Sequence, residues 1–128
     1  MAGQKYVLVY IGDTTCPACI SFTSTWERLV QDSELKQAVT LQSKIFTGKK
    51  VTIKAFDFID GFPTIALVPA QYYSTEKMGQ YAKIFTGPRT LENIKSWTLL
   101  NVPRQMPVVQ QPTRAGPNYR PVNNNAFW

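Results

Sequence analysis

The strongest constraint on the fold is a strand-like segment that runs almost directly into a closely spaced pair of cysteines. Residues 6–11, Tyr-Val-Leu-Val-Tyr-Ile, form a continuous apolar run rich in β-branched and aromatic side chains. Such a run is typical of a strand that is buried on both faces, as the central strands of parallel sheets are. The pattern therefore predicts a central strand over 5–11, followed by a polar turn, Gly-Asp-Thr-Thr, at 12–15.

The cysteines stand at the start of the next predicted element. Apolar residues recur at three- and four-residue spacing after the turn, which predicts an amphipathic helix. They are Cys19, Phe22, Trp26, Leu29 and Val30. Pro17 occupies the first helical position, where a backbone N–H has no intrahelical partner in any case. Cys16 therefore lies at the helix boundary, and Cys19 lies one turn later.

The rest of the first hundred residues predicts a mixture of strands and helices. A loosely periodic pattern after Ser33 predicts a second helix that reaches Ile45 and ends before Gly48. Strands are predicted over three segments, 51–58, 64–68 and 80–85. A long polar connection fills 69–79, and Thr90 is predicted to cap a final helix. The sequence thus predicts an α/β domain with a central mixed sheet of about four strands flanked by helices.

Few functional groups are available for chemistry. The chain has 128 residues, 44% of them hydrophobic, which is enough apolar material for one compact core. It has two cysteines and no histidine. Catalysis by a Ser-His-Asp or Cys-His arrangement is therefore excluded, and two thiolates alone do not complete a four-coordinate zinc site. We expect neither a metal nor a cofactor.

The spacing of the two cysteines predicts redox chemistry. Unpaired N–H groups and the positive end of the helix dipole stabilise a thiolate at Cys16. The two intervening residues bring Cys19 within disulfide reach, so that Cys16 can attack a substrate disulfide and Cys19 can resolve the mixed disulfide. Pro17 stiffens the loop between them. The alternative interpretation is that the pair only forms a local structural disulfide.

Three motifs give the chain a resemblance to the thioredoxin superfamily over residues 5 to about 100. They are Cys16-Pro17-Ala18-Cys19 after a hydrophobic strand, Phe62-Pro63-Thr64 before the next strand, and Thr86-Gly87-Pro88-Arg89-Thr90 before the last helix. The last motif is most similar to the catalytic domains of protein disulfide isomerases. The resemblance implies a thioredoxin-like fold and protein thiols or disulfides as partners.

The resemblance also implies roles for particular residues. Pro63 would follow a cis peptide bond beside the cysteines, and Phe62 would offer its backbone to a substrate peptide. With Pro17 and Ala18, these two residues are the predicted substrate contacts. Thioredoxins place a buried aspartate, a proton acceptor for the resolving cysteine, six residues before the first cysteine. Tyr10 stands at that position here.

The last 28 residues differ in composition from the rest. Residues 101–128 contain five prolines, five asparagines and three glutamines, and end in Ala126-Phe127-Trp128. Such a segment cannot offset its ordering entropy alone, so it is either a disordered tail or an extended strap that docks on a partner. The strap supports an alternative function, in which a thioredoxin-like body, residues 1–100, is a structural component. A minor capsid protein of a large virus would be one example.

Charge and hydropathy bear on partners and location. The net charge is +6, and residues 101–128 contribute three arginines and no acid. Three scattered arginines make a thin electrostatic footprint, so nucleic-acid binding is not expected. The apolar run near the N-terminus is too short for a signal peptide or a membrane span. We expect a cytoplasmic protein, or one within a particle assembled in the cytoplasm, that is neither secreted nor membrane-spanning.

Overall fold

A computed structural model describes residues 5–102 of the chain. Its sheet has four strands in the order β2-β1-β3-β4. They are β1 (Tyr6–Asp13), β2 (Thr40–Phe46), β3 (Thr64–Pro69) and β4 (Lys83–Ile84). β1 pairs with β2 in parallel and with β3 in antiparallel, and β4 is antiparallel to β3. The predicted mixed sheet with a central first strand is confirmed.

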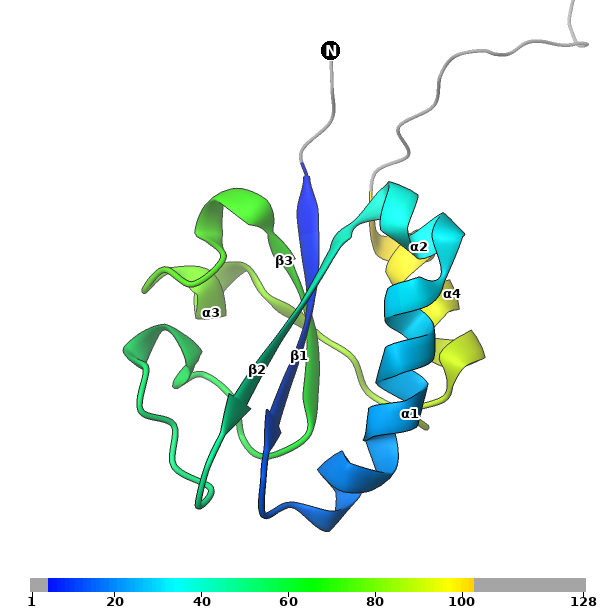
Figure 1. The fold of residues 1–128 in the computed structure, drawn as a ribbon. Helices are drawn as coiled ribbons and strands as arrows, with labels where there is room; N and C mark the ends of the chain where they lie inside the picture. Colours follow the sequence, from blue (N-terminus) through cyan, green and yellow to red (C-terminus); the bar gives the residue numbers. More distant parts are fainter. Residues whose placement is uncertain (1–4, 103–128) are drawn as a thin grey trace, which may run out of the picture.

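The three helices that the sequence predicted cover one face of this sheet, the second of them shorter than expected. They are α1 (Pro17–Gln31), α2 (Ser33–Ala38) and α4 (Leu91–Asn101), which lie together on one side of β1 in Figure 1. Leu8 and Tyr10 of β1 meet Phe22 and Trp26 of α1 in the core of this face. Ile94 of α4 is fully buried in the same cluster. The helical spacing seen in the sequence thus corresponds to the faces that are buried.

Short, irregular segments cover the opposite face. They include two 3₁₀ helices, η1 (Lys54–Phe56) and η2 (Ala70–Tyr72), and the short helix α3 (Met78–Tyr81). Phe56 and Met78 pack there against the other side of β1 and β3. The sheet therefore has a true second core, built from loops and single turns rather than from long helices (Figure 1).

Two segments after α1 differ from the predictions. The helix predicted to reach Ile45 ends at Ala38, and Leu41 and Ile45 belong to β2. The strand predicted over 51–58 is a loop that contains η1. The Asp57 N–H donates to the Lys54 carbonyl oxygen at 3.1 Å, which closes a 3₁₀ turn in place of a bond to a neighbouring strand. In both places, packing against β1 overrode a weak local pattern.

The segments around β3 also change boundaries. β1 continues through Gly12 and Asp13, which were expected in a turn, because both pair with β2. The connection expected over 69–79 contains η2 and the start of α3. The strand predicted over 80–85 shrinks to the two residues of β4. Tyr81 belongs to α3 and stacks on Tyr72 at 4.0 Å between ring centroids, which holds this region in a turn of helix.

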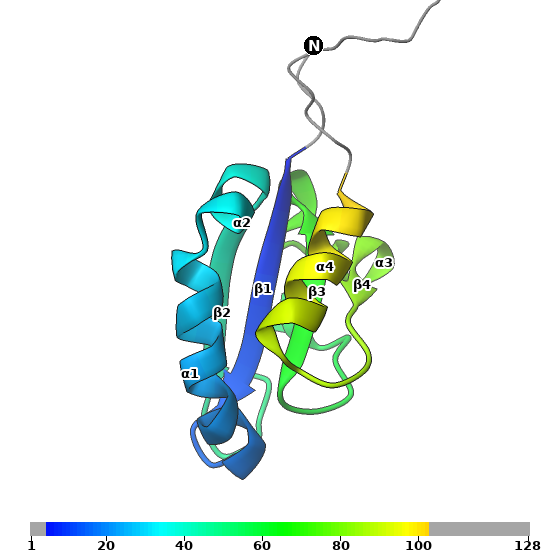
Figure 2. The same ribbon diagram turned by 90° about the vertical axis from the view of Figure 1, so that its right-hand side faces the viewer.

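Different segments of the chain lie at the two ends of the sheet. The loop from β1 to α1, which carries the cysteines, lies at one end, and the end of α4 lies at the other (Figures 1 and 2). The described chain ends at Val102, directly after α4, at the end of the sheet opposite the loop before α1. The tail and strap predicted for 101–128 lie outside the described residues, apart from the first two. Within 5–102, no helix is long and apolar enough to cross a membrane.

Candidate functional site

The two cysteines frame the first turn of α1. Cys16 is the N-cap residue, and its Sγ accepts a hydrogen bond from the Cys19 N–H at 3.2 Å. Pro17 stands at the start of the helix, as predicted, and both Pro17 and Ala18 are exposed. Both cysteines are free thiols and are nearly buried. The sulfur of Cys16 therefore faces the unpaired N–H end of the helix, where negative charge is stabilised.

Cys19 is more deeply buried than Cys16, and its pKa lies above the usual value for a thiol. Burial raises the pKa of the Cys19 thiol, and its hydrogen bond with the Cys16 side chain raises it further. Hydrogen bonds from the Asp13 backbone and the Tyr10 hydroxyl act in the opposite direction but do not outweigh burial. The two thiols thus have different environments: the Cys16 sulfur borders the hollow at the end of the helix, and the Cys19 side chain is buried beneath it.

Tyr10 lies under this turn of helix. Its hydroxyl donates to the Cys19 carbonyl oxygen at 3.4 Å, and its ring packs against Phe22 at 5.1 Å between centroids. Burial raises the pKa of Tyr10, and the nearby Cys19 adds to the effect, so the phenol stays protonated. The resemblance implied a proton acceptor at this position. The chain has a hydrogen-bond donor there instead.

Gly12 makes room for the Tyr10 ring. The two residues point to the same face of β1, and a Cβ on Gly12 would lie 2.6 Å from the Tyr10 Cζ. Real side chains do not approach so closely, so any larger residue would displace the ring. The missing side chain at Gly12 is therefore part of what places Tyr10 against the cysteine turn.

The structure brings the predicted Phe-Pro motif next to Cys16. The peptide bond between Phe62 and Pro63 is cis. The Cys16 thiol donates to the Phe62 carbonyl oxygen at 3.7 Å, across 46 positions of sequence. Phe62 is half-buried and Pro63 is buried. Among the predicted substrate contacts, Phe62 is thus hydrogen-bonded to Cys16 although it is far from it in the sequence.

A hollow opens beside Cys16. It has a volume of about 370 Å³ and is lined by Cys16, Lys49, Val51, Ile59, Asp60, Gly61 and Phe62. The sequence predicted a strand over 51–58 and no functional role for the residues from 49 to 61, so this wall of the site was missed. A second hollow of about 330 Å³ lies on the helix side and includes Ala18, Phe22 and Arg89. The cysteine loop is therefore flanked on both sides by space for a bound chain.

Asp13 holds the loop before Cys16. Burial would raise the pKa of Asp13, but hydrogen bonds from Thr15 and from the Lys49 backbone outweigh it and keep that pKa below its usual value. The carboxylate is therefore ionised at neutral pH although it is buried. Sequence reasoning placed Asp13 only in a polar turn. The run Asp-Thr-Thr directly after a strand was the available signal, since aspartate at such a position often bonds the N–H two residues later.

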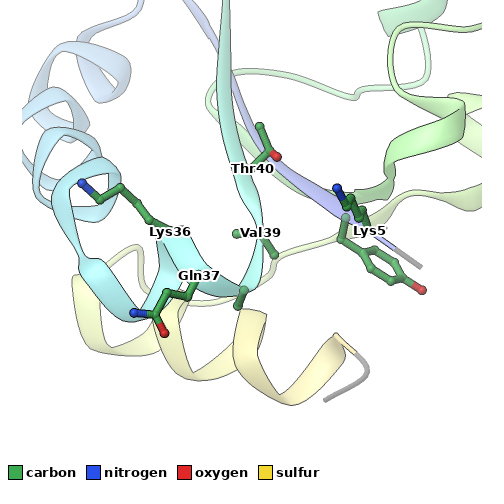
Figure 3. Close-up of a pocket in the computed structure, with 7 residues that line it drawn as sticks. Lys5, Lys36, Gln37, Val39 and Thr40 are labelled. Carbon is green, nitrogen blue, oxygen red and sulfur yellow. The ribbon is translucent and has the colours of Figure 1, made fainter. Parts of the chain in front are cut away.

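A hollow at the other end of the sheet offers different chemistry. Figure 3 shows Lys5 and Lys36 on opposite sides of it, with Val39 and Thr40 between them, and its volume is about 280 Å³. None of its lining residues is a cysteine, aspartate or glutamate. This hollow therefore supplies nothing for thiol chemistry. Within residues 5–102, no three His, Cys, Asp or Glu side chains are grouped to hold a metal ion.

The arrangement of elements matches known thioredoxin domains. The J-Trx1 fragment of ERdj5 superposes with a TM-score of 0.59 at 13% identity, over 76% of this chain and 43% of that one. The first two thioredoxin domains of Naumovozyma dairenensis Eps1p give 0.55 at 18% identity, over 74% and 34%. Chloroplastic thioredoxin z gives 0.53 at 18% identity, over 76% and 78%.

These likenesses establish the fold. The chain spans less than half of the ERdj5 fragment and about a third of the Eps1p structure. No protein-family model and no curated protein sequence matches it. The fold is thioredoxin-like, with a pair of cysteines at Cys-x-x-Cys spacing.

Proposed function

We propose that this chain, which has the fold of a thioredoxin domain, is a thiol–disulfide oxidoreductase that acts on protein disulfides. One observation carries the proposal. The sulfur of Cys16 caps α1, accepting the Cys19 N–H at 3.2 Å, and it borders a hollow that a substrate chain can enter. A sulfur at a helix N-terminus is held where a thiolate is stabilised, and thiolates are the reactive form in disulfide exchange.

Cys16 is the attacking residue in the first step. Its thiolate attacks one sulfur of the substrate disulfide, which forms a Cys16–substrate disulfide and releases the other substrate sulfur as a thiolate. The developing charges lie next to the N–H groups of the first turn of α1. Phe62 supports the docking of the substrate, because it lines the hollow and its carbonyl oxygen lies 3.7 Å from the Cys16 sulfur.

Cys19 completes the exchange. It loses its proton to the substrate thiolate released first, and its own thiolate then attacks the Cys16 sulfur. The Cys16–Cys19 disulfide forms and the second substrate sulfur leaves as a thiolate, which takes up the proton that Cys16 gave up to solvent when it ionised. In total the cysteine pair loses two electrons and two protons, and the substrate gains them. An external dithiol returns the pair to its reduced form.

The substrate contacts proposed from the sequence fit this scheme. Pro17 and Ala18 are exposed at the tip of the loop, and Ala18 borders the second hollow. A substrate chain that crosses the loop would contact these residues and lie along Phe62 and Pro63. The partners are therefore protein thiols and disulfides, recognised by backbone and apolar contacts around the reacting sulfur.

Trapping of a mixed disulfide tests the proposal. The full chain is incubated with insulin and dithiothreitol, and reduction of insulin is followed by turbidity. Cys16→Ser should lower the rate of reduction to that of dithiothreitol alone. In a separate incubation without dithiothreitol, reduced Cys19→Ser should accumulate a covalent complex with insulin, which dithiothreitol added afterwards cleaves. Ile20→Ser, at a 65% exposed site on the same helix, is the matched control and should behave as the native chain. A Cys16→Ser variant that reduces insulin faster than dithiothreitol alone would sink the proposal.

A further inference from the structure

The Asp13 carboxylate joins two segments that are far apart in the sequence. Asp13 is 2% exposed and ends β1. Its Oδ1 accepts hydrogen bonds from the Thr15 N–H at 2.8 Å and the Thr15 hydroxyl at 2.7 Å. Its Oδ2 accepts the Lys49 N–H at 2.6 Å, across 36 positions of sequence. Each oxygen of a buried charge is thus satisfied, one by the loop before Cys16 and the other by the turn after β2.

The turn that contains Lys49 has an uncommon backbone conformation. Gly48 and Lys49 both have positive φ, 69° and 60°, and an antiparallel bridge between Thr47 and Lys50 closes the turn. Two successive left-handed residues are typical of a tight hairpin turn, which favours glycine or asparagine. A lysine adopts this left-handed conformation where contacts with the surrounding structure hold its backbone in place. The hydrogen bond from the Lys49 N–H to the Asp13 carboxylate is such a contact.

This turn forms one wall of the hollow beside Cys16. Lys49 and Val51 line that hollow together with Cys16 and Phe62. Figure 1 shows the turn after β2 lying beside the loop after β1, at the same end of the sheet. The carboxylate therefore connects this wall to the loop before the reacting sulfur, although Asp13 itself is not among the residues that line the hollow.

We propose that Asp13 is a positioning residue for substrate binding: it fixes the Gly48–Lys49 turn as a wall of the hollow in which the disulfide-bearing chain binds beside Cys16. This inference rests on the proposed function. It predicts a role in binding rather than in the reactivity of the sulfur. Loss of the carboxylate should loosen the wall and raise KM for a protein disulfide, while Cys16 keeps its place at the end of α1.

Asp13→Asn is the variant that tests it. Asparagine keeps the size of the side chain, but an amide nitrogen replaces one oxygen and cannot accept the Lys49 or Thr15 N–H. Hydrogen bonds to a charged acceptor are strong, so we expect KM for insulin to rise about tenfold. The rate of Cys16 alkylation by iodoacetamide should stay at the native value. The Lys49 amide should lose protection from hydrogen exchange, measured by NMR.

Two further variants keep the test decisive. Asp57→Asn removes the same charge from an exposed position in the loop between β2 and β3, and should leave KM and exchange unchanged. Gly48→Ala loosens the same wall from the other side. Its φ of 69° strains an alanine, although no atom lies within 4 Å of the added Cβ. If Asp13→Asn does not fold, a raised KM in Gly48→Ala with unchanged Cys16 alkylation supports the inference.

The outcomes separate this inference from the proposed function. A native chain that reduces no disulfide overturns the proposed function, and the inference with it. An active native chain whose Asp13→Asn and Gly48→Ala variants retain the native KM overturns the inference alone. A fall in the Cys16 alkylation rate in Asp13→Asn, with KM unchanged, would also overturn it, because Asp13 would then act on the sulfur and not on the wall.

Discussion

The two ends of α1 are capped in different ways. At the N-terminal end the capping atom is the Cys16 sulfur, which accepts the Cys19 N–H at 3.2 Å. At the C-terminal end the chain passes straight into α2, and the Asp32 carboxylate caps that helix through the Leu35 N–H at 2.9 Å. Lys95 of α4 binds the other Asp32 oxygen at 3.0 Å and Glu34 at 3.1 Å.

The comparison shows that one cap serves the chemistry of the site and the other serves the stability of the fold. Aspartate, asparagine and serine are the preferred N-cap residues, and sulfur is a weak acceptor. The cysteine end therefore has a poor cap that is able to react, and the opposite end has a strong cap that ties three helices together. The N-terminal end compensates by packing, because Tyr10 lies against the turn that carries Cys19.

The largest expected effect comes from changing the poor cap into a good one. Cys16→Ser removes the nucleophile, so the rate of insulin reduction should fall to that of dithiothreitol alone. Serine is a better cap than cysteine, so the free energy of unfolding should rise by up to about 1 kcal/mol. Turbidity and urea denaturation measure the two quantities. If stability fell instead, the idea that the site accepts a weak cap for the sake of reactivity would be wrong.

The packing that supports the cysteine end can be broken at Gly12. Gly12→Ala places a Cβ against the Tyr10 ring and should destabilise the fold by about 1–3 kcal/mol, the usual cost of overpacking. Thermal or urea unfolding measures this. Gly61→Ala is the matched control, since no atom lies within 4 Å of its Cβ, and it should change stability little. Equal effects in both variants would contradict the role given to Gly12.

A substitution at the C-terminal end of α1 should lower the stability of the protein without lowering its activity. Asp32→Ala removes the cap of α2 and the partner of Lys95, and should cost about 1 kcal/mol. Urea denaturation measures the cost, and insulin reduction by the folded variant should match the native rate. A clear loss of activity would show that the two ends of α1 are coupled, and would contradict the view that the Asp32 cap serves stability alone.

The smallest effect is a change in pH dependence. The hydrogen bond from the Leu35 N–H and then the bond from Lys95 lower the pKa of Asp32. Its folded pKa lies below the unfolded value of about 3.9, so its contribution is full above that pH and is lost as pH falls through the folded pKa. Asp32→Asn keeps an N-cap but removes the charge. Its urea midpoint should fall less steeply than the native one below about pH 4, and parallel curves would contradict the assignment.

Strong periodicity identified the elements of the helical face. The spacing of Phe22, Trp26 and Leu29 predicted α1, because a long amphipathic helix repeats its signal over several turns, and Thr90 as a cap predicted the start of α4. The continuous run after Lys5 likewise predicted the central strand. The face covered by η1, η2 and α3 was not predicted. Segments of three or four residues are too short to repeat a pattern, and only contact with the sheet fixes them.

The candidate site divides in the same way. Cys16, Cys19 and the Phe62-Pro63 motif could be found in the sequence, because their chemistry depends on residue type and local spacing. The wall of the hollow beside Cys16 could not, because it depends on which distant turn meets the loop after β1. Asp13 shows this: one of its oxygens bonds a residue two positions away, and the other bonds Lys49.

The sequence by itself determined the central strand, the helix that begins at the cysteines, and the limits on chemistry set by two thiols and no histidine. The tertiary structure decided where β2 begins, how the second face of the sheet is covered, and which residues surround the Cys16 sulfur. The physical reason is the range of the interactions. Helix periodicity and capping act within a few residues, whereas strand pairing, the packing of Phe56 and the bond from Lys49 to Asp13 join residues that only the folded chain brings together.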